Sequence, residues 1–332
     1  MSSLKKIARI YSIKSSQFIE MELSHNKLLK IDNRDIKFLR NILLETSQFK
    51  EINEHNWYLS FFTDSKDFCQ HIYVNFYNND TLLETLQSWC SQEWYNFNED
   101  KKLSWKKYDD LCRLTLMITD KEKPNDKEVA VTCAAVRDSK SIQLDDLWET
   151  STHYGHIDGK GLMFLTNMEK QEFLFQRHII LLALAHAYLG AIESINNKLS
   201  QVISLSNENE KSMQELRNIY LQIAKFNARY MFIQPVKRAH TSLTMAWEKI
   251  EKALNINKLN NELTKQINTV HYILKIDDDE KQEKQALLRQ EAERIDAKQN
   301  QKLNNKLTWI GIVISIIGLI SVFKDIKELL SL

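Results

Sequence analysis

The sequence predicts an α+β protein that is mostly helical, and three features of its 332 residues support this. Up to about residue 150 the chain mixes strand-like and helix-like patterns, whereas the pattern after about residue 165 is helical. The stretch from Val236 to Ile310 holds neither glycine nor proline, which permits long helices. An uncharged apolar segment, Leu307 to Phe323, lies near the C-terminus.

These features divide the chain into five parts. The expected order is a mixed α/β cytosolic, sensor-like domain (1–150), a helical bundle (151–276), a polar stalk helix (277–306), one transmembrane helix (307–323) and a short tail (324–332). The first two parts are each long enough to bury a core.

Four segments of the first part are predicted to be strands. Aromatic and β-branched residues roughly alternate in 56–63 and 70–78. Segments 111–119 and 128–136 flank a turn at Pro124, so we expect them to form a hairpin.

A helix is expected over 81–97, covering one face of the sheet, because Leu82, Leu86, Trp89 and Cys90 recur at helical spacing. Five of the seven tryptophans also fall in this half of the chain: Trp57, Trp89, Trp94, Trp105 and Trp148. Without an interleaved basic stripe they favour core packing over stacking on bases. A net charge of +1 gives no reason to expect a nucleic-acid partner.

Segment 152–164 holds half of the glycines and two histidines. One interpretation is that His153 and His156 share a metal ion with Asp158. No further ligand can be identified, so we interpret the segment as a turn-rich domain boundary. The four cysteines form no CxxC pair, which favours buried free thiols in a reducing cytosol and predicts no cofactor.

The second part is predicted to be helical throughout. Segment 177–195 is apolar around His186 but too short to span a bilayer, so we expect a buried helix and a hydrogen-bonded core histidine. An amphipathic helix over 211–234 should stop before Pro235. Apolar steps of three and four then continue, with a phase shift at 255–257, and indicate antiparallel helices or a bundle shared between subunits.

The stalk is half charged and is expected to be a solvated helix, with Asp277–Lys281 and Glu280–Lys284 as stabilising pairs. Its acidic run comprises Asp277, Asp278, Asp279 and Glu280. Repeated around a symmetric oligomer, this run would form a ring of carboxylates able to bind a divalent cation. The alternative is a solvated helix start, where acidic residues are favourable.

The apolar segment is expected to cross a membrane. Trp309, Lys306 and Lys324 would anchor its two ends at the interfaces. Basic residues are more numerous before the segment than after it, and the N-terminus lacks a signal peptide. We therefore expect a tail-anchored protein of the cell inner membrane with its N-terminal body in the cytoplasm.

Small residues line one face of this segment, and they predict self-association into a homo-oligomer. The packing face comprises Gly311, Ser315, Gly318 and Val322.

The stretch "IAKFNARYMFIQPVKRAHTSLTMAWEKIEKALNINKLNNELTKQI" (223–267), which leads into the stalk, resembles the CorA-like magnesium-transporter group. The resemblance implies a ring-shaped oligomer in which residues 307–323 line a pore and conduct ions. The family has a Gly-Met-Asn signature followed by a second transmembrane helix. Here Phe323 is followed only by "KDIKELLSL", so no filter residue is carried over.

Together these features predict a non-enzymatic, oligomeric effector, ion-conducting or membrane-perturbing, that is gated by its cytosolic domain, as in bacterial phage defence. The gating ligand, a small molecule or a protein, is unknown. The alternative is a cytosolic binding module merely tethered to the membrane. An enzyme is the third possibility, against which the sequence has no nucleophile elbow, no HExxH helix and no paired metal-ligand motif.

Overall fold

The structure, a computed structural model, describes residues 2–13, 30–31, 34–53, 55–78, 108–137, 139–205 and 210–330. The chain forms two compact units, Met1–Thr269 and Val270–Leu332. Residues on both sides of position 150 therefore belong to the same unit.

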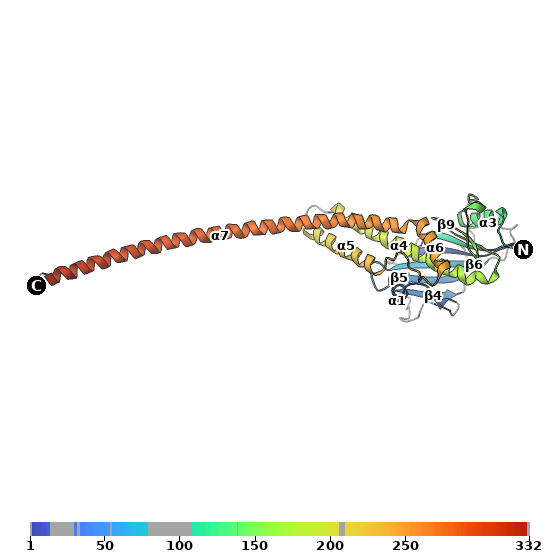
Figure 1. The fold of residues 1–332 in the computed structure, drawn as a ribbon, viewed down its shortest axis with the longest axis horizontal. Coiled ribbons are helices and arrows are strands. Elements are labelled where there is room, and N and C mark those ends of the chain that lie inside the picture. The colour runs from blue at the N-terminus through green and yellow to red at the C-terminus, as the bar shows by residue number, and fades with distance from the viewer. Residues whose placement is uncertain are drawn as a thin grey trace. The chain divides into compact units, whose positions relative to one another are not determined.

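The described elements follow one another along the chain and are coloured by residue number in Figure 1. They are β1 (Ser3–Ile13), β2 (Lys30–Ile31), β3 (Arg34–Asp35), α1 (Asn41–Glu45), β4 (Ser47–Asn53), β5 (Asn56–Phe61), β6 (Gln70–Asn78), β7 (Tyr108–Ile118), α3 (Asp126–Arg137), η4 (Leu144–Asp146), β8 (Trp148–Glu149), β9 (Tyr154–Asp158), β10 (Gly161–Thr166), η5 (Glu169–Gln171), α4 (Glu172–Leu205), α5 (Glu210–Arg229), α6 (Thr241–Leu254) and α7 (Ile256–Leu330).

Eight strands form one sheet in the order β4-β5-β6-β1-β7-β10-β9-β8. Neighbouring strands are antiparallel except β7 and β10, which are parallel. The strands predicted at 56–63 and 70–78 are confirmed as β5 and β6, and the strand predicted at 111–119 is confirmed as β7. The helix expected over 81–97, with Leu82, Leu86, Trp89 and Cys90, lies outside the described residues.

The hairpin expected around Pro124 is wrong, because 128–136 belongs to helix α3. A capping box starts this helix: the Asn125 side chain accepts a hydrogen bond from Glu128 N (3.0 Å), and Glu128 Oε2 accepts one from Asn125 N (2.7 Å). The valines alternate like those of a strand but also fit a helical period. Parallel strands need a long crossover, and α3 lies within the crossover from β7 to β10.

The domain boundary expected at 152–164 is also wrong, because this segment forms the antiparallel hairpin β9–β10 within the sheet. Two of its glycines lie where a side chain would clash with a neighbouring residue, so they do not indicate a linker. A Cβ on Gly155 would lie 2.4 Å from the Trp148 ring. Gly161 has φ +154°, and a Cβ there would lie 1.7 Å from the carbonyl oxygen of Arg113 on β7.

Gly161→Ala is therefore expected to lower the free energy of unfolding by about 2–4 kcal/mol, through backbone strain and overpacking against β7. Gly159→Ala is the matched control, since a Cβ at Gly159 meets nothing within 4 Å. Urea unfolding of a chain that ends at Asn304 measures both. Equal stability of the two variants would contradict this account of the hairpin.

Helices cover both faces of the sheet where β7 and β10 lie side by side. On one face, Met163 and Leu165 pack with Val129 and Cys133 of α3. On the other, Phe164 meets Phe175 of α4 edge to face, with ring centroids 5.8 Å apart. The buried β10 therefore lies in the middle layer of three, between α3 and α4.

Helix α4 confirms the buried helix predicted at 177–195, and the side chains from Ile179 to Leu184 are fully buried. Trp57, 2 % exposed, confirms core packing for that tryptophan, and Trp148 is half-buried, whereas Trp89, Trp94 and Trp105 lie outside the described residues. Cys112 and Cys133 are buried free thiols as expected, and Cys69 is a half-buried one.

The helix predicted over 211–234 is confirmed as α5 but ends at Arg229, before Pro235 is reached. Tertiary contacts bend the chain earlier: Trp247 Nε1 donates to the carbonyl oxygen of Ile233 (2.8 Å), and Val236 forms a β-bridge with Leu39. The phase shift predicted at 255–257 is confirmed, because Asn255 has φ +54° and separates α6 from α7.

Candidate functional site

The end of α7 is an apolar helix whose described side chains are exposed on every side. Its backbone is helical to Leu330, and its side chains are described to Gly318. Eight large apolar residues between positions 307 and 317 are 44–68 % exposed: Leu307, Trp309, Ile310, Ile312, Val313, Ile314, Ile316 and Ile317. Successive residues turn by about 100°, so these eight positions cover about 220° of the helix. The remaining arc holds only small, uncharged residues: Thr308, Gly311, Ser315 and Gly318.

Helix α4 is also long and apolar, but its apolar side chains are buried. It is the one helix in the described part of the chain that is long and apolar enough to cross a membrane, yet 72 % of its most apolar stretch is buried. Helix α4 belongs to unit Met1–Thr269, which we call the body. Its apolar surface is thus accounted for by the sheet and by α5 and α6. The apolar surface of residues 307–317 has no such cover within unit Val270–Leu332.

The predicted packing face is open in the single chain. A Cβ added to Gly311 or Gly318 would meet nothing within 4 Å. Ser315 Oγ donates to the carbonyl oxygen of Gly311 (2.8 Å), so its hydroxyl is satisfied within the helix. The Val322 side chain lies outside the described residues. Self-association through this face stays a prediction.

Of the predicted interface anchors, Trp309 and Lys306 are exposed and the Lys324 side chain lies outside the described residues. Trp309 is 68 % exposed, the largest value among the eight described large apolar residues between positions 307 and 317. Its ring thus projects from the helix one turn after the last stalk lysine, where a membrane interface is expected.

The acidic run forms no ligand cluster in one chain. Asp277 forms the predicted i, i+4 ion pair with Lys281 (3.0 Å). Asp278, Asp279 and Glu280 follow at steps of about 100°, so their carboxylates diverge around the helix. Within the described residues no group of three or more His, Cys, Asp or Glu side chains is placed to hold a metal ion. A divalent-cation ring built from several copies stays a prediction.

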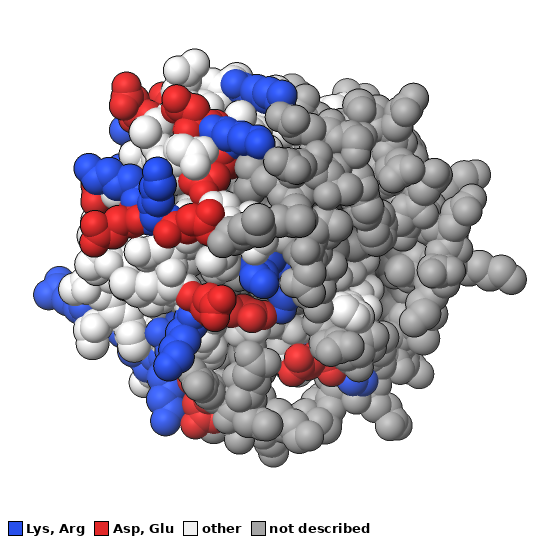
Figure 2. Space-filling model, turned by 90° about the vertical axis from the view of Figure 1, so that its right-hand side faces the viewer, with Lys and Arg blue, Asp and Glu red and all other residues white. Residues whose placement is uncertain are grey.

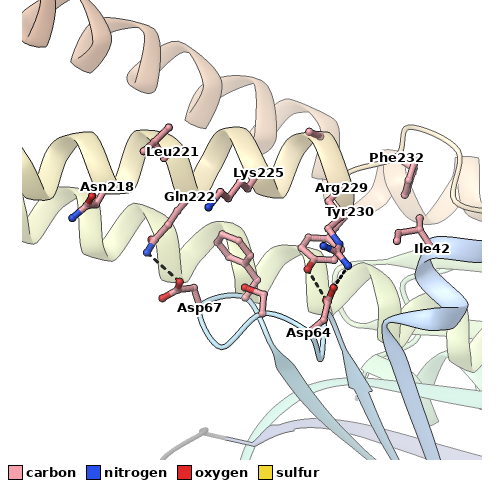
Figure 3. A pocket seen from close by; sticks show the side chains of 13 residues that line it. Ile42, Asp64, Asp67, Asn218, Leu221, Gln222, Lys225, Arg229, Tyr230 and Phe232 are labelled. Atoms are coloured by element: carbon pink, nitrogen blue, oxygen red, sulfur yellow. Dashed lines mark hydrogen bonds and ion pairs between the residues drawn. The ribbon is translucent and has the colours of Figure 1, made fainter. Parts of the chain in front are cut away.

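The body carries a groove that the sequence did not indicate, shown in Figure 3. Its volume is about 1000 Å³, and it lies between the loop that joins β5 to β6 and helix α5. It is lined by Ile42, Asp64, Ser65, Asp67, Phe68, Asn218, Leu221, Gln222, Lys225, Ala228, Arg229, Tyr230 and Phe232. The size suits a small molecule or a short peptide.

Hydrogen bonds and an ion pair between residues that line this groove fix the loop between β5 and β6 to the C-terminal half of α5 and to Tyr230 (Figure 3). Asp64 accepts a hydrogen bond from Tyr230 Oη (2.6 Å) and forms an ion pair with Arg229. Asp67 accepts a hydrogen bond from Gln222 Nε2 (3.1 Å). Asp67 also forms an ion pair with Lys198 of α4 (3.1 Å). Burial and the hydrogen bond to Asp64 raise the pKa of Tyr230, so its hydroxyl stays a donor.

An aromatic cluster next to the groove packs the loop between β5 and β6 against α4 and α5. Phe62 lies at the start of the loop with φ +59°, a left-handed conformation that is unusual for a bulky residue. Its ring packs on those of Tyr188, Phe226 and Tyr230, with centroids 5.0–5.7 Å apart. These contacts hold the loop against α4 and α5 despite the backbone strain.

Asn227 of α5 donates to Thr264 Oγ1 of α7 (3.4 Å), next to the groove residues Ala228 and Arg229. Helix α5 therefore contacts both the groove and the first part of α7.

The two histidines of α4 and the first histidine of segment 152–164 are buried or nearly so. His153 stacks on Phe164 and meets His178 edge to face, with centroids 4.1 Å and 5.2 Å away. Burial lowers the pKa of His153 to about 3 and that of His178 to about 4. His186 is partly buried, and burial lowers its pKa to about 4. Its Nε2 has no hydrogen-bond partner among the described residues, so the hydrogen bond predicted for a core histidine is not found at this atom. His156 is partly buried, and its Nε2 lies 3.7 Å from Oδ2 of Asp158.

Acid is expected to destabilise the body because these histidines fold in the neutral form. Their folded pKa values lie below the usual 6.5, so the unfolded chain binds more protons between about pH 4 and 6.5. Stability should be flat above pH 7 and fall by about 1.4 kcal/mol per pH unit for each buried histidine below 6.5. Urea unfolding of a chain ending at Asn304 at pH 7.5, 6.5 and 5.5 tests this. His178→Leu should reduce the slope, whereas His271→Gln, on exposed α7 surface, should not.

Charges of both signs alternate over the described part of the face drawn in Figure 2. No single-sign field gathers there for a polyanionic partner.

No family model, curated protein or solved structure matches this chain. The resemblance to CorA-like proteins thus rests on the predicted order of the parts and on the apolar spacing of residues 223–267, and it stays a prediction.

Proposed function

We propose that this protein is a non-enzymatic membrane effector whose cytoplasmic body controls a cluster of C-terminal membrane helices. Residues 307–323 cross the inner membrane, and several copies pack through the face of Gly311, Ser315 and Gly318. The assembled helices conduct ions or perturb the bilayer. The observation that carries the proposal is the apolar end of α7, exposed on all sides, which has unfavourable contact with water and favourable contact with lipid.

The dimensions of the segment support this assignment. Seventeen helical residues span about 25 Å, close to the roughly 30 Å of a hydrocarbon core. Interfacial Trp309 and long lysine side chains at the ends compensate for the difference. The groove supplies the input, because a ligand that alters the Asp64–Arg229 contact also acts on α5 and, through Asn227, on α7.

Dye release from liposomes tests the proposal directly. The full chain should release the dye, and a chain ending at Asn304, which keeps the body and most of the stalk, should release none. Equal release by the two proteins would overturn the proposal.

The second candidate function, a binding module tethered to the membrane, is favoured by the groove itself. Replacing Gly311 and Gly318 by leucine separates the two candidates. The added side chains keep helix backbones apart, so a packed assembly should lose dye release and oligomeric mass in detergent. A tether should keep membrane attachment and any groove activity unchanged. Ile312→Leu and Ile316→Leu form the control pair, since these positions lie off the small-residue face.

A further inference from the structure

The charge of the stalk changes sign shortly before the apolar segment. Between positions 277 and 296 the chain has eight acidic and four basic residues, a net charge of −4. Between positions 297 and 306 it has three lysines and no acid, a net charge of +3. A stalk that only needed solvation would not require this separation, because mixed signs give more i, i+4 pairs.

The three lysines form what we call the basic stripe: Lys298, Lys302 and Lys306. They are four residues apart, so each is rotated by only about 40° from the previous one and the set occupies an arc of about 80°. All three are exposed, and none forms an ion pair within the part of the chain that the structure describes. The nearest preceding acid, Asp296, lies about 160° around the helix from Lys298.

We infer that the basic stripe binds the headgroups of anionic lipids in the leaflet that faces the body. The inference rests on the proposed membrane insertion of residues 307–323. Lys306 adjoins Leu307, and Lys302 and Lys298 lie about 6 Å and 12 Å further along the axis. The headgroup layer is about 5–7 Å thick, and the potential of an anionic surface extends about 8 Å beyond it. All three ammonium groups therefore fall within the layer or its field.

Continuity with the apolar segment favours lipid over a polyanionic macromolecule. The stripe is only about 12 Å long and ends where the hydrocarbon core would begin, so its charges coincide with a phosphate-rich surface. A nucleic acid would meet only three cations there and would compete with the membrane for the same place.

Competition between two vesicle populations tests the inference. Full-length protein is synthesised in the presence of equal amounts of phosphatidylcholine vesicles and vesicles containing about a third phosphatidylglycerol, and each population is recovered by flotation. Each lysine near an anionic surface should contribute about a fivefold preference, and the three together about a hundredfold at low salt. The variant with Lys298, Lys302 and Lys306 replaced by glutamine should distribute nearly equally, as should wild type at about 0.5 M salt.

The control variant replaces Lys275, Lys281 and Lys284 of the same helix by glutamine. It has the same net charge as the stripe variant and should keep the wild-type preference. A control that loses the preference equally would show that net charge matters and the stripe does not, which overturns the inference. Equal distribution of the wild type would overturn it while leaving membrane insertion intact. Wild type that floats with neither population would overturn the proposed function as well. Preference that a DNA duplex abolishes would assign the stripe to nucleic acid instead.

Discussion

Ile314→Lys is expected to release the protein from membranes. Ile314 is 64 % exposed and lies one residue from the middle of the segment 307–323. A lysine at the centre of a membrane helix costs about 3 kcal/mol or more relative to isoleucine, on the order of a hundredfold in partitioning. Fractionation of cells that express the variant should therefore move it from the membrane pellet to the soluble or aggregated fraction.

Ile295→Lys is the matched control for this prediction. Ile295 lies on the same helix and is 51 % exposed, so the two substitutions differ only in the medium that the proposal assigns to each side chain. In water both changes would be almost neutral. If the two variants distribute alike, the apolar end of α7 is not in lipid.

The second large effect is expected in the body, from Phe226→Ala. The ring is fully buried in α5 and packs on Phe62 and Phe68, with centroids 5.7 Å and 5.1 Å away. Removing a buried phenylalanine costs about 3–5 kcal/mol. The loss should also release the loop between β5 and β6 and open the groove. Urea unfolding gives the stability, and proteolysis in this loop reports the release.

Leu221→Ala on the same helix is the comparison for this substitution. Leu221 lines the groove but is 53 % exposed, so its truncation should change stability by only about 0.5 kcal/mol. Similar losses for both variants would show that Phe226 does not anchor the loop.

Local patterns predicted those parts of the fold in which neighbouring residues decide the outcome. The strands β5 and β6, the buried α4 and the break at Asn255 all follow from spacing within about 20 residues. The apolar end of α7 was also predictable, because the run of uncharged residues 307–323 is visible in the sequence without knowledge of distant contacts.

Tertiary context decided the elements that sequence reasoning missed. Residues 128–136 fit both a helical and an alternating pattern, and the parallel pairing of β7 with β10 selects the helix. The glycines of segment 152–164 suggested a linker, whereas Gly155 makes room for the Trp148 ring.

The groove could not be predicted from the sequence for the same reason, because its residues come from distant parts of the chain. Asp64 and Arg229 are separated by more than 160 positions, and neither belongs to a motif. The only local signal was two aspartates in the loop "TDSKDF", which is ordinary for a turn. Contacts at this sequence separation have no period to detect, so only the fold brings them together.

Extraction of the full-length protein from membranes tests the central claim most directly. Membranes from cells that express it are washed with alkaline carbonate and with high salt, which remove peripheral proteins, and then with detergent. The account predicts that the chain stays in the pellet through both washes and dissolves only in detergent, whereas the chain ending at Asn304 is soluble from the start. Full-length protein that is monodisperse in buffer without detergent would contradict it.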